Sequence, residues 1–364
     1  MTTRPNLFSF ATSELSQDAF LCWLAALSTS DDRELSHAGR RFLAWLWESA
    51  GNSSVDPEHV KLVGLPERQV ERIDVLLRAE VLGKPVTFLI EDKTHTSHHS
   101  GQLGRYRTAA EKRLPQVVPI YFKTGYHFGE DASARDAGYT VIGLDSWVEF
   151  LHRVELKNDI LDDYRAHLSS LLRERTATLD ALWTSGGFGH LRTDYAQYAF
   201  LSRLQQHCPN LDANSPSAIS RGTNMGGTPW SHLGFAWLAN TLSDGIGESF
   251  FHRVDKRRHG DGDRYYLSTR QYAEVKGSPE ARKAKVSRLW QHRRAFDEAK
   301  KVPGTSLVFS KPSGDSRGAN ESEIGVLFFD DSTNTTRAVL EQFPRIHEAF
   351  ITRLRAHIGE GFPE

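Results

Sequence analysis

Apolar positions in the first half of the chain change between helical spacing and strand-like runs. Apolar side chains recur three and four residues apart over 14–28 and 38–50, which predicts two amphipathic helices. The apolar runs 73–77 and 88–90 are short and nearly continuous, which is typical of buried strands. Leu-Gly-Lys-Pro at 82–85 has turn chemistry, so we expect these two strands to pair as a hairpin.

Further elements follow the predicted hairpin. The pattern predicts strands at 117–122 and 139–144, and helices at 101–114, 147–153 and 159–175. Helices followed by three to five strands, with a crossover helix between strands, predict an α/β domain with a mixed central sheet.

The chain length and a glycine-rich stretch predict two domains. With 364 residues, the chain is long enough for about two domains, each with its own core. Thr-Ser-Gly-Gly-Phe-Gly at 184–189 is the clearest linker signal. We therefore expect a first domain at 1–176, a linker at 177–190 and a second domain at 191–364.

The second half has the pattern of an α+β domain. We expect two strand pairs, each followed by a helix, as in a ββα unit used twice. The predicted segments are a helix at 194–208, a loop at 209–229, a hairpin of 250–254 with 264–272, a helix at 279–301, strands at 306–310 and 323–329, and a helix at 337–358.

Charged residues interrupt the predicted hairpin. Asp74 lies within the first strand, and the second strand runs directly into Glu91-Asp92-Lys93. Because strand side chains alternate between faces, Glu91 and Lys93 should project to one side and Asp92 to the other. Carboxylates at the edge of a core cost several kcal/mol unless something pairs them, and a divalent cation would do so.

The neighbouring helices carry further polar candidates. Glu14 and Asp18 lie four residues apart on one face of the first helix, where like charges repel unless a cation is near. Alternatively, acidic residues simply favour a helix N-terminus. Gln102 and Tyr106 lie one turn apart at the start of the helix at 101–114.

These residues, taken together, resemble the PD-(D/E)XK nuclease superfamily, which has the restriction-endonuclease-like fold. Asp74, Glu91 and Lys93 match the acidic residue and the Glu-x-Lys of its motif, although an isoleucine replaces the proline. Gln102 and Tyr106 look like the QxxxY element of RecB-like exonuclease branches. The resemblance implies that these two residues hold the scissile phosphate or waters around the metal.

The resemblance, which covers roughly residues 6–150, also implies a cofactor. Mg²⁺ or Mn²⁺ would be held by Asp74, Glu91, the backbone carbonyl of Asp92, and Glu14, since both cations prefer oxygen ligands. Lys93 would orient or deprotonate the attacking water and oppose charge on the phosphate.

The charge distribution suggests a nucleic-acid partner. The formal net charge is −1, but residues 253–301 hold 15 Lys/Arg against 7 Asp/Glu, an excess of +8, so the remainder carries −9. A basic surface suits a phosphate backbone, although charged helices are also often merely solvated. The candidate nucleic-acid-binding residues are Arg282, Lys283, Lys285, Arg288, Trp290, Arg293 and Arg294.

Two other segments carry weaker signals. His95, His98 and His99 follow Lys93, but no cysteine pair or helical His-Glu-x-x-His accompanies them, so a substrate-facing loop is favoured over zinc. The glycines of 221–230 do not form a P-loop. An ordinary loop is favoured there over a ligand site built from backbone amides.

Cellular context also follows from composition. The chain has two cysteines, Cys22 and Cys208, no signal-peptide pattern and no long apolar stretch, so we expect a cytoplasmic protein without a membrane partner.

We therefore expect a Mg²⁺- or Mn²⁺-dependent nuclease acting on DNA, and by resemblance a role in microbial defence against phage. Alternatives are a nuclease acting on RNA or in repair, or a non-catalytic nucleic-acid-binding or ligand-sensing protein on a nuclease-derived fold. The intact Asp74, Glu91 and Lys93 argue against the last alternative. The second domain would bind nucleic acid, sense a ligand or form a homo-oligomer.

Overall fold

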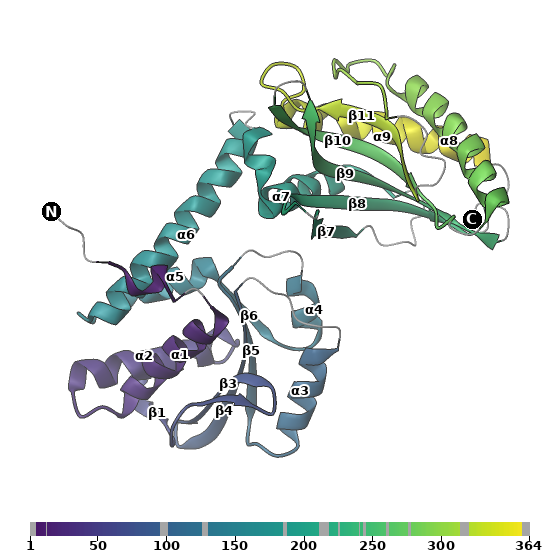
Figure 1. Cartoon of the computed structure of the whole chain (residues 1–364). Helices are drawn as coiled ribbons and strands as arrows, with labels where there is room; N and C mark the ends of the chain where they lie inside the picture. Colours follow the sequence, from purple (N-terminus) through teal and green to yellow (C-terminus); the bar gives the residue numbers. More distant parts are fainter. Residues whose placement is uncertain are drawn as a thin grey trace. The chain divides into compact units, whose positions relative to one another are not determined.

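The chain forms two compact units, Met1–Arg175 (unit 1) and Thr176–Glu364 (unit 2) (Figure 1). The division falls one residue before the end of the predicted first domain. A computed structural model describes residues 5–11, 13–94, 101–125, 130–184, 188–210, 218–224, 226–239, 241–242, 245–259, 262–275, 278–313 and 320–358.

Unit 1 is built on a mixed sheet, as expected for an α/β fold. Within its described residues the sheet has six strands in the order β1-β3-β4-β5-β6, with β2 paired to β3. The β3–β4 pair is antiparallel, whereas β4–β5 and β5–β6 are parallel. The strands are β1 Val60–Leu62, β2 Glu67–Val70, β3 Ile73–Val81, β4 Lys84–Lys93, β5 Val117–Lys123 and β6 Thr140–Gly143.

Helices cover both faces of this sheet (Figure 1). The larger apolar cluster joins one sheet face to α1, α2, α5 and α6, and a smaller cluster joins the other face to α3 and α4. The bounds are η1 Leu7–Ser9, α1 Glu14–Ala26, η2 Leu27–Thr29, α2 Arg33–Ser49, η3 Pro57–His59, α3 Gln102–Glu111, α4 Glu130–Asp136, α5 Leu144–Arg153 and α6 Asp159–Thr184, where η denotes a 3₁₀ helix.

The predicted hairpin is confirmed. Val81 pairs with Lys84, so a two-residue turn connects β3 and β4. Leu82 and Gly83 both have positive φ, 50° and 75°, as the twist of a tight hairpin turn requires. The turn fixes the register that brings Asp74 of β3 to the charged end of β4.

The predicted linker at 177–190 is wrong over its first half. Helix α6 continues to Thr184, past the end of unit 1, because its apolar spacing continues as far as Leu182, which is fully buried. Residues 185–187 lie outside the described residues, and η4 begins at Phe188.

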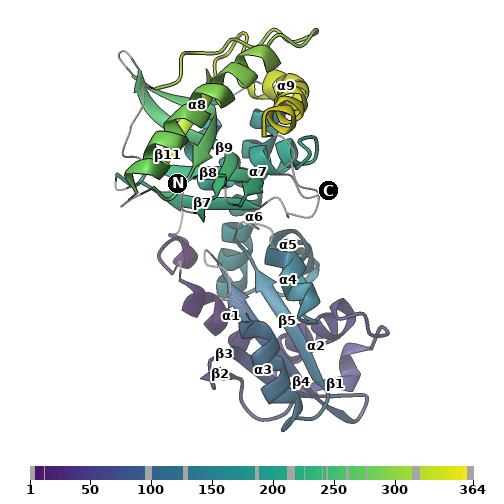
Figure 2. The ribbon, with the colours of Figure 1, turned by 90° about the vertical axis from the view of Figure 1, so that its right-hand side faces the viewer.

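Unit 2 contains an antiparallel sheet with helices packed against it. Within the described residues the sheet has five strands in the order β11-β10-β9-β8-β7. Helices α7, α8 and α9 share one apolar cluster with these strands, and Figure 2 shows α8 crossing in front of them. The elements are η4 Phe188–Arg192, α7 Asp194–Gln205, β7 Ile219–Thr223, β8 Pro229–Leu238, β9 Glu248–His259, β10 Gly262–Tyr272, α8 Pro279–Ala299, β11 Glu321–Phe328 and α9 Thr336–Ile358.

The predicted twofold ββα arrangement is wrong. Helix α8 connects β10 to β11 along the chain, yet these two strands are neighbours in one sheet. The predicted strand at 306–310 contributes only one bridge, from Ser310 to Val326. Strands β7 and β8 occupy part of the predicted loop at 209–229 and the segment after it. Their glycine and serine residues hid the strand pattern, yet Gly222 is needed there because a Cβ would lie 2.5 Å from the Trp230 ring.

No described helix is both long enough and apolar enough to span a bilayer.

Candidate active site

The charged end of the β3–β4 hairpin forms a compact cluster. Lys93 Nζ lies 2.8 Å from Asp74 Oδ2 and 2.9 Å from Glu91 Oε1. The same ammonium donates to the backbone carbonyl of Asp92 at 2.7 Å, and the Asp92 amide donates to Asp74 Oδ2 at 2.9 Å. The three residues that match the nuclease motif therefore converge on one point.

The Asp92 side chain lies on the opposite face of β4, as the strand alternation predicts. It is fully buried, and its Oδ1 accepts a hydrogen bond from Gln17 Nε2 of α1. Gln17 Oε1 in turn accepts from Thr124 Oγ1 at 2.6 Å and from Tyr164 Oη at 2.9 Å. This buried network fixes the end of β4 against α1.

Helix α1 brings two carboxylates to the cluster. Glu14 Oε1 accepts a hydrogen bond from the backbone amide of Thr94, directly after Lys93. Asp18 is 1% exposed, and its Oδ2 lies 3.4 Å from Gln69 Nε2, which also donates to Asp74 Oδ1 at 3.1 Å. The helical spacing of Glu14 and Asp18 thus serves one site.

Helix α3 supplies one of its two predicted residues. Gln102 Nε2 donates to Glu91 Oε1 at 2.7 Å, so it orients that carboxylate. Tyr106 instead packs, partly buried, in the apolar cluster that also holds Leu103 and Tyr139. The structure therefore places Gln102 in the site and Tyr106 in the packing beneath α3.

The cluster contains more negative charge than its lysine can neutralise. Asp18 Oδ1, Glu91 Oε2 and Asp92 Oδ2 are buried, and they are the only buried carboxylate oxygens in the described part of the chain without a hydrogen-bond partner. A buried carboxylate oxygen without a donor is costly, so each one needs a proton or a cation.

The pKa values of these acids reflect the shortage of positive charge. Burial, assisted by Asp74, raises the pKa of Glu91 to about 7. Burial also raises the pKa of Asp18, and raises that of Asp92 well above its ordinary range. Asp18 and Asp92 are neighbours that would share a proton when no cation is bound.

Lys93 responds in the opposite direction. Burial by itself would lower its pKa, but Glu91 and Asp74 more than offset this effect and raise the pKa above the usual value. In this arrangement Lys93 is a charged hydrogen-bond donor, which favours the water-orienting role over the deprotonating one.

The donor set fits a hard divalent cation better than a metal that prefers thiolate or imidazole ligands, such as zinc or copper. Carboxylate and carbonyl oxygens surround the Lys93 ammonium, and Mg²⁺ and Mn²⁺ prefer such ligands. Among the described residues, no three Asp, Glu, His or Cys side chains already surround a single metal position. Binding would require a cation to take over contacts that Lys93 makes. His95, His98 and His99 lie outside the described residues.

The predicted basic surface on α8 is wrong for its inward-facing residues. Lys285 is 3% exposed, donates to Ser322 Oγ at 2.9 Å, and has a pKa lowered by burial to about 8. Arg288 Nε donates to the buried Glu248 at 2.6 Å. Their side chains hold α8 on the sheet and are not available for phosphate.

Of the other candidate nucleic-acid-binding residues of α8, some donate hydrogen bonds to backbone carbonyls and the rest are exposed to solvent. Arg293 donates to the carbonyls of Glu323 and Ser313 at 2.9 and 2.8 Å, and Arg282 Nε donates to the Val275 carbonyl at 3.3 Å. Three predicted residues remain exposed on this helix, namely Lys283, Trp290 and Arg294.

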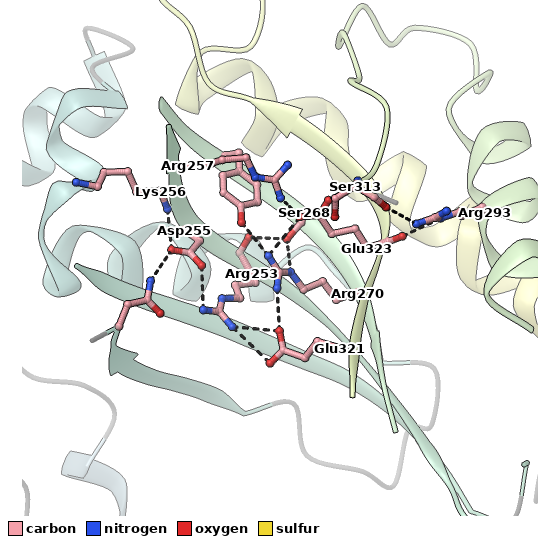
Figure 3. A network of polar contacts seen from close by, with 12 residues as sticks. Arg253, Asp255, Lys256, Arg257, Ser268, Arg270, Arg293, Ser313, Glu321 and Glu323 are labelled. Carbon is pink, nitrogen blue, oxygen red and sulfur yellow. Dashed lines mark hydrogen bonds and ion pairs between the residues drawn. The ribbon is translucent and has the colours of Figure 1, made fainter. Parts of the chain in front are cut away.

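The basic excess of 253–301 is partly offset in three dimensions. Figure 3 shows arginines of β9 and β10 interleaved with carboxylates on one sheet face. Arg270 Nη1 lies 2.8 Å from Glu321, and Arg253 Nη2 lies 2.9 Å from Asp255. Glu321 and Glu323 come from β11, outside the basic segment, so a charge count along the sequence overstates the basic surface.

Some site residues carried no usable sequence signal. Gln17 is an ordinary polar residue in a helix, and Gln69 belongs to the short strand β2, which the sequence pattern did not predict. Asp18 had a signal, since it lies one turn after Glu14. Comparison of the chain with family models, with curated proteins and with solved structures found no match.

Proposed function

We propose that the chain is a metal-dependent nuclease that hydrolyses phosphodiester bonds, with DNA as the favoured substrate. The observation that carries this proposal is the partnerless buried oxygen of Glu91 at the Asp74–Lys93–Glu91 contact, together with the partnerless buried oxygens of Asp18 and Asp92 at the same end of β4. A structural ion cluster would balance its charges, whereas this one sets the single ammonium of Lys93 against several carboxylates. The role in phage defence stays a prediction from resemblance.

The cofactor would be Mg²⁺ or Mn²⁺. Asp74, Glu91, the Asp92 carbonyl and Glu14 are the oxygen donors that would hold it. Such a cation, when bound, activates water and stabilises negative charge on the phosphate.

The chain's own residues would prepare the attack. The Lys93 ammonium is held at the carboxylate cluster, so it can orient a water and oppose charge on a phosphate oxygen. Gln102 restrains the Glu91 carboxylate, and the buried Gln17 contact with Asp92 fixes the strand end. Catalytic groups need this support because small misplacements reduce rates strongly.

The test is cleavage by purified protein. Linear and circular DNA and RNA, single- and double-stranded, would be incubated with Mg²⁺, Mn²⁺ or EDTA. We expect metal-dependent cleavage that EDTA abolishes. Glu91→Gln removes a charged oxygen while keeping the shape of the side chain, so it should reduce cleavage by about 100-fold or more.

The matched control is Glu80→Gln on β3, where the glutamate lies 3.2 Å from the amine of Lys61, away from the cluster. Glu80→Gln should cleave like the parent. Titration calorimetry with Mn²⁺ should show weaker binding for Glu91→Gln only. Equal cleavage by Glu91→Gln and parent, or no cleavage of any substrate with either metal, would refute the proposal.

A further inference from the structure

A groove in unit 2 has features of an anion-binding surface. It encloses about 840 Å³, within the range of ~300–1,000 Å³ that is typical of ligand sites. Its lining comes from the end of α6, from α7 and from α9, and all of these residues belong to unit 2. The residues that matter here are Trp183, Arg203, His207, Arg337, Glu341 and Arg345.

Arg203 is held in the groove without being neutralised. Its guanidinium lies over the Trp183 ring, 4.5 Å from the centroid. No carboxylate among the described residues pairs with it. A cation–π contact orders the side chain but leaves its charge and its N–H donors free for an anion.

The remaining charges of the groove also favour an anion. Arg345 forms no ion pair within the described part of the chain, and Arg337 pairs with Glu341 at 2.8 Å in an exposed i,i+4 contact. Such exposed pairs are weak and open readily. Three arginines against one glutamate give the lining a net charge of +2.

Buried contacts hold the groove in shape. Thr336 Oγ1 donates to the carbonyl of Leu182 at 2.6 Å, and both residues are fully buried. The next residue in each segment, Arg337 and Trp183, therefore lies at the groove. The arginine donors are mounted on helices that share the core cluster of unit 2.

We infer that this groove binds a single nucleic-acid strand through its phosphodiester groups, with the Trp183–Arg203 stack receiving a base. This inference rests on the proposed function, because it takes nucleic acid as the protein's substrate. Arginines combined with an aromatic ring are the usual means of binding single strands without sequence preference. The proposed binding surface is therefore this groove and not helix α8, because Lys285 and Arg288 of α8 donate hydrogen bonds to Ser322 and Glu248.

Binding can be tested separately from cleavage. The full chain would be titrated into a fluorescent oligothymidylate of about 12 nucleotides in EDTA, and anisotropy followed across a salt series. Arg203→Gln with Arg345→Gln should weaken binding about 10-fold or more. The slope of log affinity against log salt should fall by about 1.4, since each single-strand phosphate contact contributes about 0.7.

The matched control is Lys283→Gln with Arg294→Gln, which removes two exposed charges from α8. This pair should bind within about twofold of the parent if the groove is the site. Polyglutamate at equal charge should compete poorly, because it offers no base to stack. Parental affinity of the groove variant, an equal loss in the α8 variant, or equal competition by polyglutamate would each overturn the inference.

The two proposals fail in distinguishable ways. Glu91→Gln should keep the parental anisotropy curve in EDTA, and the groove variant should need about 10-fold more substrate than the parent to reach half-maximal cleavage. If no nucleic acid is cleaved but the groove variant still loses binding, the nuclease proposal fails and the groove stands. If the parent cleaves nucleic acid but the groove variant binds as tightly as the parent, the nuclease proposal stands and the groove inference fails.

Discussion

Buried charges are arranged differently in the two units. Among the described residues of unit 2, each buried carboxylate has a cation, as with Glu248 beside Arg288 and Glu323 beside Arg257. Burial alone would raise the pKa of Glu248, but His292 and Arg288 lower it to about 2. In unit 1 the pKa of Glu91 is instead raised to about 7, chiefly by burial. The same residue type is thus stabilised as an ion in unit 2, whereas in unit 1 Lys93 and Gln102 compensate the burial of Glu91 only in part.

A buried histidine pair in unit 2 gives a pH prediction. His347 Nε2 donates to the Pro209 carbonyl at 2.7 Å, so its Nδ1 accepts from His252 Nε2 at 2.8 Å. His252 Nδ1 then accepts from Thr269 Oγ1, which makes both rings neutral. Burial lowers the pKa of His347 to about 4, while the unfolded chain takes up the proton near pH 6.5.

The direction in which stability changes with pH follows from proton uptake by the unfolded chain. Between about pH 6.5 and 4 the unfolded state binds more protons than the folded state, so stability is full above this window and falls as pH drops. His347 accounts for about 3 kcal/mol of that loss. His347→Gln should therefore flatten the decline in unfolding free energy from pH 7 to 4.5 by about 2 kcal/mol.

Urea unfolding at several pH values measures this effect. The exposed His207→Gln is the matched control and should keep the parental slope. An unchanged pH dependence in His347→Gln would mean that the His252–His347 pair is protonated or solvated in the folded protein.

For individual residues, the sequence predicted those contacts that depend on the alternation of side chains along a strand. Asp74, Glu91 and Lys93 follow from two-residue periodicity at adjacent strand ends, because neighbouring strands bring such residues together. The Gln17 contact with Asp92 links residues 75 positions apart, and local periodicity carries no information on it. Lys285 reads as a surface residue until its buried partner on β11 is known.

At the scale of elements, α2 is set by a close approach at Gly39. A Cβ there would lie 2.1 Å from the backbone nitrogen of Ser28 in η2, directly after α1. Gly104 of α3 is also helical, but nothing lies within 4 Å of the corresponding Cβ position. Alanine substitutions at these two glycines therefore separate the effect of helix propensity on stability from the effect of packing.

Gly39→Ala should lower the unfolding free energy by about 1–3 kcal/mol, since backbone atoms cannot yield as a side chain can. Gly104→Ala should raise it by up to about 1 kcal/mol, because alanine favours a helix. Urea unfolding of both variants gives the comparison. Stabilisation of both proteins would show that α2 and η2 can separate without cost.

Element prediction failed where patterns were interrupted. The β3–β4 hairpin follows from continuous apolar runs and a two-residue turn. Strand β8 alternates weakly, and its register shifts between Gly234 and Ala236 opposite β9. A bulge moves later side chains to the other face, so a fixed period of two does not detect the strand.

At the scale of the whole molecule, each unit has its own apolar core. Leu43 of α2 and Leu201 of α7 are both fully buried, one in each core. Leucine-to-alanine changes at such positions cost about 2–5 kcal/mol. Two cores should give two unfolding transitions in calorimetry, with Leu43→Ala lowering one midpoint and Leu201→Ala the other.

Metal should then act on one transition only, because all its proposed ligands lie in unit 1. A cation that binds only the folded unit stabilises it by about 2.7 kcal/mol at 100 times its dissociation constant. Mn²⁺ should raise the midpoint that Leu43→Ala lowers, and Glu91→Gln should remove most of that shift. EDTA should reverse it. A Mn²⁺ effect on the midpoint that Leu201→Ala lowers would instead place a metal site in unit 2, and equal shifts of both midpoints would show that the units unfold as one.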